Sequence, residues 1–123
     1  MGIDIYARWN GQTEEERTAQ NTGFSVHHGH VGYLREAYHG IPYATTHLVA
    51  EAFENGQAQI PAAVLKARLP MTIKLVTERE EQLYGTTDRS EVQRIIASFI
   101  DFVELCARKE HETGEPVTII ASF

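Results

Sequence analysis

The sequence is poor in cysteine and in basic residues, and it has no long apolar run. Its single cysteine, Cys106, excludes an intramolecular disulfide framework and any zinc site built on several cysteines. No apolar stretch reaches the roughly 18–20 residues of a transmembrane helix. The opening MGIDIYARWNG also lacks the basic-then-apolar order of a secretory signal. We therefore expect a cytoplasmic protein that does not associate with membranes.

The charge balance argues against general nucleic-acid binding. The chain carries 17 acidic and 11 basic side chains, a net charge of −6, and neither half contains a basic run. Proteins that bind nucleic acids draw most of their affinity from Lys and Arg side chains that neutralise phosphates. The 123 residues and the 42% hydrophobic content are those of an ordinary globular protein, so we expect one domain over residues 1–123.

Strands are predicted at both ends of the chain, with helices in the second half. Ile3–Trp9 alternates apolar and polar residues, and Val117–Phe123 is β-branched and apolar, so both stretches favour strands. Two prolines stand where a first helical turn favours proline and predict helices over Pro61–Arg68 and Pro70–Tyr84. From Val92 to Cys106, apolar residues recur on one helical face. This pattern predicts an α+β fold, in which a small sheet that includes the N- and C-terminal strands packs against helices from the C-terminal half.

The middle of the chain is harder to interpret. Thr13 and Glu16 have the spacing of a capping box and predict a short exposed helix over Thr13–Gln20. Phe24–Val31 favours a strand that Gly29 interrupts, and Gly32–His39 is predicted as a short helix. Tyr43–Phe53 mixes strand-favouring and helix-favouring residues and stays open between the two.

The apolar face of the last long helix extends past 100°, more than we expect one short sheet to cover. It predicts a homo-oligomer, in the simplest case a homodimer. Alternatively, the chain is a protein-interaction module whose face recruits another protein. Cys106 lies on this face and is expected to be a core residue rather than a nucleophile. There is no Gly-x-Ser-x-Gly elbow, so we predict no catalytic residue and favour a non-enzymatic protein.

Histidine is concentrated in one stretch, because five of the six histidines lie between residues 27 and 47. On an extended backbone His28 and His30 would share a face, and with Asp4 or Glu36 they could bind a divalent transition metal such as Zn, Ni or Fe. Gly29 lets the chain turn, which would make the cluster a solvent-facing turn. A metal-dependent hydrolase that uses His28, His30 and Glu36 is therefore an alternative, whereas the leading prediction has no metal and no cofactor.

The same region combines arginine and tyrosine. In a helix over Gly32–His39, Arg35 and His39 would be i, i+4 neighbours, with Leu34 and Tyr38 on another face. The guanidinium of Arg35 is suited to phosphate or carboxylate, and tyrosine rings stack on planar ligands. We therefore predict that the chain binds a small anionic, nucleotide-like ligand without catalysis, through residues of this region: Arg35, His28, His30, His39, Tyr33, Tyr38 and Tyr43. The alternative is a surface pair of Arg35 with Glu36 and tyrosines that pack at a sheet edge.

Three segments resemble a group of small bacterial and phage-encoded proteins of unknown function. They are the opening Gly2-Ile3-Asp4-Ile5-Tyr6 with Trp9, the stretch from Gly32-Tyr33-Leu34-Arg35-Glu36-Ala37-Tyr38-His39-Gly40 to Pro42-Tyr43-Ala44-Thr45, and the ending Glu115-Pro116-Val117-Thr118. The resemblance covers nearly the whole chain. It implies a stand-alone cytoplasmic protein of bacterial or phage origin, and it brings no activity and no catalytic residue.

Overall fold

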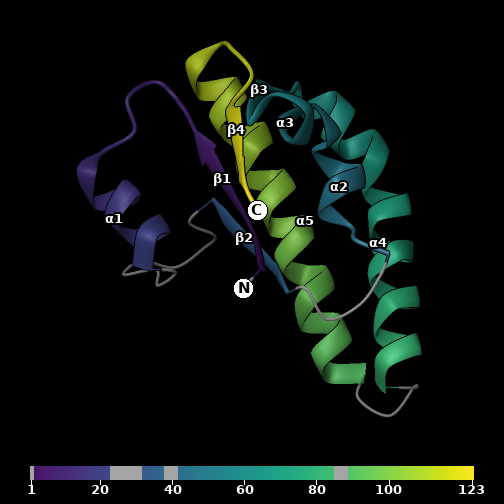
Figure 1. Cartoon of the computed structure of the whole chain (residues 1–123). Helices are drawn as coiled ribbons and strands as arrows, with labels where there is room; N and C mark the ends of the chain where they lie inside the picture. Colours follow the sequence, from purple (N-terminus) through teal and green to yellow (C-terminus); the bar gives the residue numbers. More distant parts are fainter. Residues whose placement is uncertain (1, 23–31, 38–41, 85–88) are drawn as a thin grey trace.

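A computed structural model describes residues 2–22, 32–37, 42–84 and 89–123 of the chain. These residues form strands and helices in an α+β arrangement, as the sequence predicted (Figure 1). In chain order the elements are β1 (Gly2–Arg8), α1 (Glu14–Thr22), β2 (Tyr33–Ala37), α2 (Thr45–Leu48), α3 (Ala50–Asn55), β3 (Gln57–Gln59), α4 (Ala62–Tyr84), α5 (Arg89–Thr113) and β4 (Thr118–Ser122).

The four strands form one antiparallel sheet in the order β2-β1-β4-β3. The two terminal strands β1 and β4 are therefore neighbours at its centre, which confirms the prediction that both ends of the chain enter the sheet. In β1, Ile3, Ile5 and Ala7 are buried, and the residues between them are partly exposed. The helices α4 and α5 lie on one side of the strands and α1 on the other (Figure 1). We call the side of the sheet that points away from α5 the outer face.

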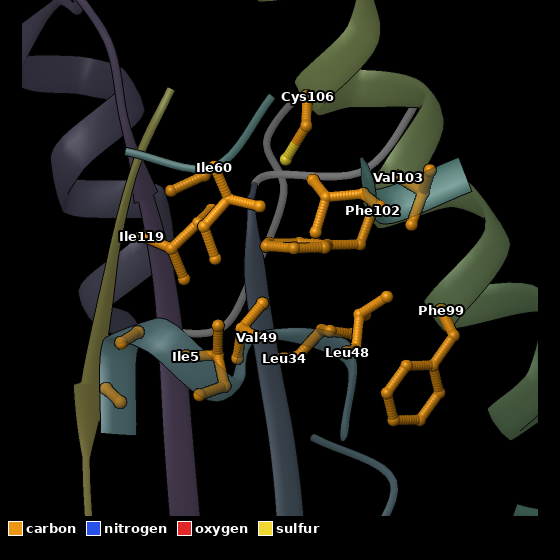
Figure 2. Packing of buried hydrophobic residues seen from close by; sticks show 14 of the residues in the cluster. Ile5, Leu34, Leu48, Val49, Ile60, Phe99, Phe102, Val103, Cys106 and Ile119 are labelled. Atoms are coloured by element: carbon orange, nitrogen blue, oxygen red, sulfur yellow. The ribbon is translucent and has the colours of Figure 1, made fainter. Parts of the chain in front are cut away.

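The hydrophobic core lies between the sheet and the helices (Figure 2). The sheet contributes Ile5, Leu34 and Ile119, and residues around α2 contribute Leu48 and Val49. From α5 come four side chains that the periodic face predicted: Phe99, Phe102, Val103 and Cys106. Because α4 packs along α5, the width of this apolar face does not by itself require a second copy of the chain.

The predicted helix over Gly32–His39 is wrong in its described part, because Tyr33–Ala37 is the edge strand β2. Leu34 and Glu36 point inward and are buried, whereas Arg35 on the other face is exposed. This period of two is that of a strand, and pairing with β1 outweighs the local helical spacing. The face that a helix would have given to Arg35 and His39 therefore does not exist in β2.

A second difference concerns proline. The chain does not form separate helices over Pro61–Arg68 and Pro70–Tyr84, because α4 runs without a break from Ala62 to Tyr84 with Pro70 inside it. An interior proline removes one backbone hydrogen bond, here to the carbonyl of Lys66, and disfavours the helix. Pro70 and Lys66 are both exposed, so water can reach this region of the helix, while the opposite side packs on α5.

The structure also tests the predicted capping box and the stretch that the sequence leaves open between strand and helix. The capping box is confirmed, since the backbone N–H of Glu16 donates to Thr13 Oγ1 at 3.1 Å and that of Thr13 donates to Glu16 Oε1 at 3.0 Å. The open stretch Tyr43–Phe53 is largely helical, as α2 and α3. The strand expected over Phe24–Val31 lies outside the described residues. None of the described helices is both long and apolar enough to cross a membrane.

Candidate functional site

The outer face of the sheet carries polar side chains, two tyrosines and Ile120 in three rows that run across the strands. The register places Arg35 opposite Asp4 in the first row, Tyr33 opposite Tyr6 in the second, and Arg8 opposite Thr118 in the third. Successive rows on one face are about 7 Å apart. The aromatic row thus lies between two rows that each contain an arginine.

In the first row, Asp4 holds both Arg35 and Tyr33. Arg35 Nη1 donates to Asp4 Oδ1 at 3.1 Å, and the Tyr33 hydroxyl donates to the same oxygen at 2.5 Å. Partial burial raises the pKa of Tyr33, and the hydrogen bond to the Asp4 carboxylate raises it further. The pKa of the Arg35 guanidinium is also raised, first by its interaction with Tyr33 and then by the charge of Asp4. The Arg35 side chain remains 51% exposed, so a charged donor group faces solvent.

The second row is a pair of stacked rings. The ring centroids of Tyr6 and Tyr33 are 5.2 Å apart, with 26° between the ring planes. The guanidinium carbon of Arg8 lies 5.6 Å from the centroid of the Tyr6 ring, within the range of a cation–π interaction. The structure therefore presents an aromatic surface with a cationic group at each end.

The structure brings together two of the predicted ligand-binding residues. Tyr33 and Arg35 lie side by side on the outer face, whereas Tyr43 packs against the hydrophobic core, next to the Ala44 backbone that donates to Glu36. Four other predicted residues lie outside the described part of the chain: His28, His30, Tyr38 and His39. The sequence did not identify Asp4 and Tyr6 as neighbours of Arg35, because only the pairing of β1 with β2 brings these residues close to it.

Glu36, the predicted carboxylate of the alternative metal site, lies in a buried network. Its Oε1 accepts hydrogen bonds from the backbone N–H and the hydroxyl of Thr45, at 3.1 and 2.6 Å. Its Oε2 accepts from the Ala44 N–H at 2.9 Å and from Arg79 Nη1. Arg79 also pairs with Glu80, and both side chains are almost fully buried. The alternative of a surface pair of Arg35 with Glu36 is thus wrong, because β2 directs the two side chains to opposite faces.

No cluster of three or more metal-binding side chains occurs within the described ranges. For Glu36 to bind a metal, its carboxylate would have to give up hydrogen bonds from Arg79 and Thr45. The two histidines of that alternative, His28 and His30, lie outside these ranges, so the metal site stays a prediction.

A pocket of about 200 Å³ opens beside the third row, at the end of β1. Arg8, Thr118 and Gln59 from three neighbouring strands line it, and α1 adds Arg17. Its other described lining residues come from the chain after β1 and from the end of α5 and the turn that follows: Trp9, Asn10, Thr113, Glu115 and Pro116. No local sequence pattern marks this pocket, because its residues come from separate segments.

Comparisons with known proteins add no relative. No protein-family model matches the chain, and neither a search of curated proteins nor a search of solved structures finds a match. The resemblance to small bacterial and phage-encoded proteins stays an expectation from the segments that carry it.

Proposed function

We propose that this protein binds a small anionic, nucleotide-like ligand on the outer face of the sheet, without catalysing a reaction. Arg35 would hold the anionic group, and the rings of Tyr33 and Tyr6 would stack on the planar part of the ligand. The observation that supports this function is the exposed Arg35 guanidinium, held by Asp4 beside two stacked tyrosines. Tyr38 and His39 follow β2 directly in the sequence and are further candidates for contacts to the ligand.

The donors of Arg35 match this role. A guanidinium has five N–H donors in a planar fork, and the bond to Asp4 uses one of them. The remaining donors can form the paired hydrogen bonds with which arginine binds phosphate or carboxylate. Asp4 orients the guanidinium, although its own charge opposes an approaching anion. In a chain with a net charge of −6, recognition by one oriented arginine is local and does not extend to polyanions.

The test is a calorimetric titration with a panel of mononucleotides and cyclic dinucleotides, together with native mass spectrometry of freshly purified protein. Arg35→Gln should weaken binding about tenfold or more, since a hydrogen bond to a charged group contributes about 1.5–3 kcal/mol. Arg94→Gln is the matched control, because Arg94 is also an exposed arginine paired with a carboxylate, that of Glu91. A wild-type protein that binds no nucleotide, or equal loss in both variants, would contradict the proposal.

Tyr33 separates stacking from hydrogen bonding. Tyr33→Phe keeps the ring and removes the hydroxyl bond to Asp4, so ligand affinity should change little. Tyr33→Ala removes the ring and should weaken binding strongly, since stacking of a base on an aromatic side chain contributes about 1–3 kcal/mol. Equal affinities of these two variants would show that the ring does not stack on the ligand.

The same preparation tests the alternatives. Near-stoichiometric Zn, Ni or Fe in elemental analysis, lost in a His28→Ala/His30→Ala variant, would favour the metal-dependent hydrolase. The proposed homodimer predicts a sedimentation mass of twice 13.8 kDa at tens of micromolar, and a mass of 13.8 kDa alone would contradict it. Partner proteins lost on charging Phe99 or Val103, in a variant that still folds, would favour the interaction module.

A further inference from the structure

The pocket beside the third row contains two arginines from different elements. Arg8 stands on the central strand β1, and Arg17 stands on α1, on the other side of the strands from α4 (Figure 1). Both line the same space of about 200 Å³. This pocket is separate from Arg35. Arg35 stands on β2 opposite Asp4, and Asp4 precedes Arg8 by four residues along β1, a distance of about 13 Å.

Two contacts within the protein orient the Arg8 guanidinium. Arg8 Nη1 donates to Gln20 Oε1 at 2.7 Å, and the guanidinium lies over the Tyr6 ring. Gln20 is itself almost fully buried, and its side-chain amide donates to the carbonyl oxygen of Ala7 at 2.8 Å. This arrangement holds the guanidinium in place and leaves further N–H donors for an anion.

Arg17 completes the cationic side of the pocket. Within the described ranges, no ion pair joins its guanidinium to a carboxylate. The carboxylate that lines the pocket, Glu115, accepts a hydrogen bond from the side chain of Asn10. Two guanidinium groups against one carboxylate leave a positive balance, in a chain whose net charge is −6.

The volume of the pocket indicates the size of the chemical group that it can hold. A cavity of about 150 Å³ accommodates benzene, whereas pockets for drug-sized molecules are about 300–1,000 Å³. A volume of about 200 Å³ therefore fits an oxyanion with few additional atoms. We infer that this pocket is a second anion site, in which Arg8 and Arg17 bind the phosphoryl group of a small molecule, with the hydroxyl of Thr118 as an added donor. This inference goes beyond the proposed function and does not depend on it.

The experiment is a titration of ¹⁵N-labelled full-length protein with inorganic phosphate at constant ionic strength, followed by NMR. We expect saturable shifts of the Arg8 and Arg17 side-chain Nε–H signals and of the Thr118 amide. Arg17→Gln should weaken phosphate binding about tenfold or more, because a charged donor is lost from the anion. Arg94→Gln removes the same charge from an exposed helical arginine near the opposite end of α5 and should leave the affinity unchanged.

Three outcomes would overturn this inference. They are shifts that stay linear without saturation, equal weakening by Arg17→Gln and Arg94→Gln, and weakening by Arg35→Gln as large as that by Arg17→Gln. The last outcome would show that phosphate does not bind selectively in the Arg8–Arg17 pocket. Conversely, nucleotide binding that fails while phosphate saturates the Arg8–Arg17 pocket would contradict the proposed function and leave this inference intact. Arg8→Lys provides a second variant, because it keeps the charge but loses the planar fork, and it should also weaken phosphate binding.

Discussion

Replacement of Glu36 by glutamine probes the buried network that joins β2 to α4. The carboxylate accepts four hydrogen bonds, two on each oxygen, from Thr45, Ala44 and Arg79. A glutamine amide has one oxygen and one NH₂ group, so its NH₂ would face at least one N–H donor, either that of Thr45 or those of Ala44 and Arg79. Each buried donor without an acceptor costs about 1–3 kcal/mol, and removal of one partner of a buried ion pair costs about 3–5 kcal/mol. We expect Glu36→Gln to lower the free energy of unfolding by about 3–5 kcal/mol.

Two further variants test whether burial is the cause. Glu91→Gln makes the same chemical change in the pair of Glu91 with Arg94, whose side chains are 46% and 73% exposed. Exposed pairs contribute about 0–1 kcal/mol, so this change should have little effect. Arg79→Met removes the cation that bonds both Glu36 and Glu80, and it should destabilise the protein at least as much as Glu36→Gln.

The assay is urea unfolding, monitored by far-ultraviolet circular dichroism and by the fluorescence of Trp9. A domain of this size has a total stability of about 5–15 kcal/mol, so the expected loss is a large fraction of the total and shifts the midpoint strongly. The slope of the transition should stay unchanged if the native fold is kept. If Glu36→Gln lies within about 1 kcal/mol of Glu91→Gln, the argument that a buried unpaired donor is costly here is refuted.

Two further predictions concern the core and the start of β2. Burial raises the pKa of Cys106 from 9.0 to about 12. The native thiol should therefore resist alkylation at pH 8 and react once urea unfolds the chain, and equal rates in both states would contradict its burial. Because the folded pKa is the higher one, this contribution to stability is complete below pH 9 and is lost as the pH rises toward 12. Gly32 has φ +83°, and a Cβ there would lie 2.6 Å from Gln20 Nε2 and 3.3 Å from Leu105 Cδ2, whereas Gly11, at φ +82°, has open space. Both alanine variants should lose about 1–2 kcal/mol in urea unfolding, and Gly32→Ala about 1–3 kcal/mol more, so equal losses would refute the steric argument.

Local patterns predicted those elements whose signal is contained in their own residues. The reciprocal hydrogen bonds of Thr13 and Glu16 span three residues, and the structure forms both. The apolar face of α5 repeats over four turns, and its members Phe99, Phe102 and Val103 are buried. Both signals lie within consecutive residues of one helix, so each prediction could be made without knowledge of contacts to other elements.

Short or ambiguous stretches required tertiary contacts. Tyr33–Ala37 has only five residues, too few for its period of two to outweigh a helical spacing, and its pairing with β1 decides the strand. Pro70 marks a plausible helix start, yet packing along α5 keeps α4 continuous. The partner of Arg35 followed from the same pairing, since β2 turns Glu36 inward to Arg79 and leaves Arg35 beside Asp4.

The sequence by itself determined the α+β class, the two terminal strands and the core face of the last helix, because hydrophobic periodicity over many residues specifies which side is buried. It also included Arg35 and Tyr33 among seven candidate ligand-binding residues. Only the tertiary structure decided that Asp4 and Tyr6 accompany them, that Glu36 is buried, and that Arg8 and Arg17 line one pocket. These residues are far apart in the chain or stand on different elements, and strand register and helix packing alone bring them together.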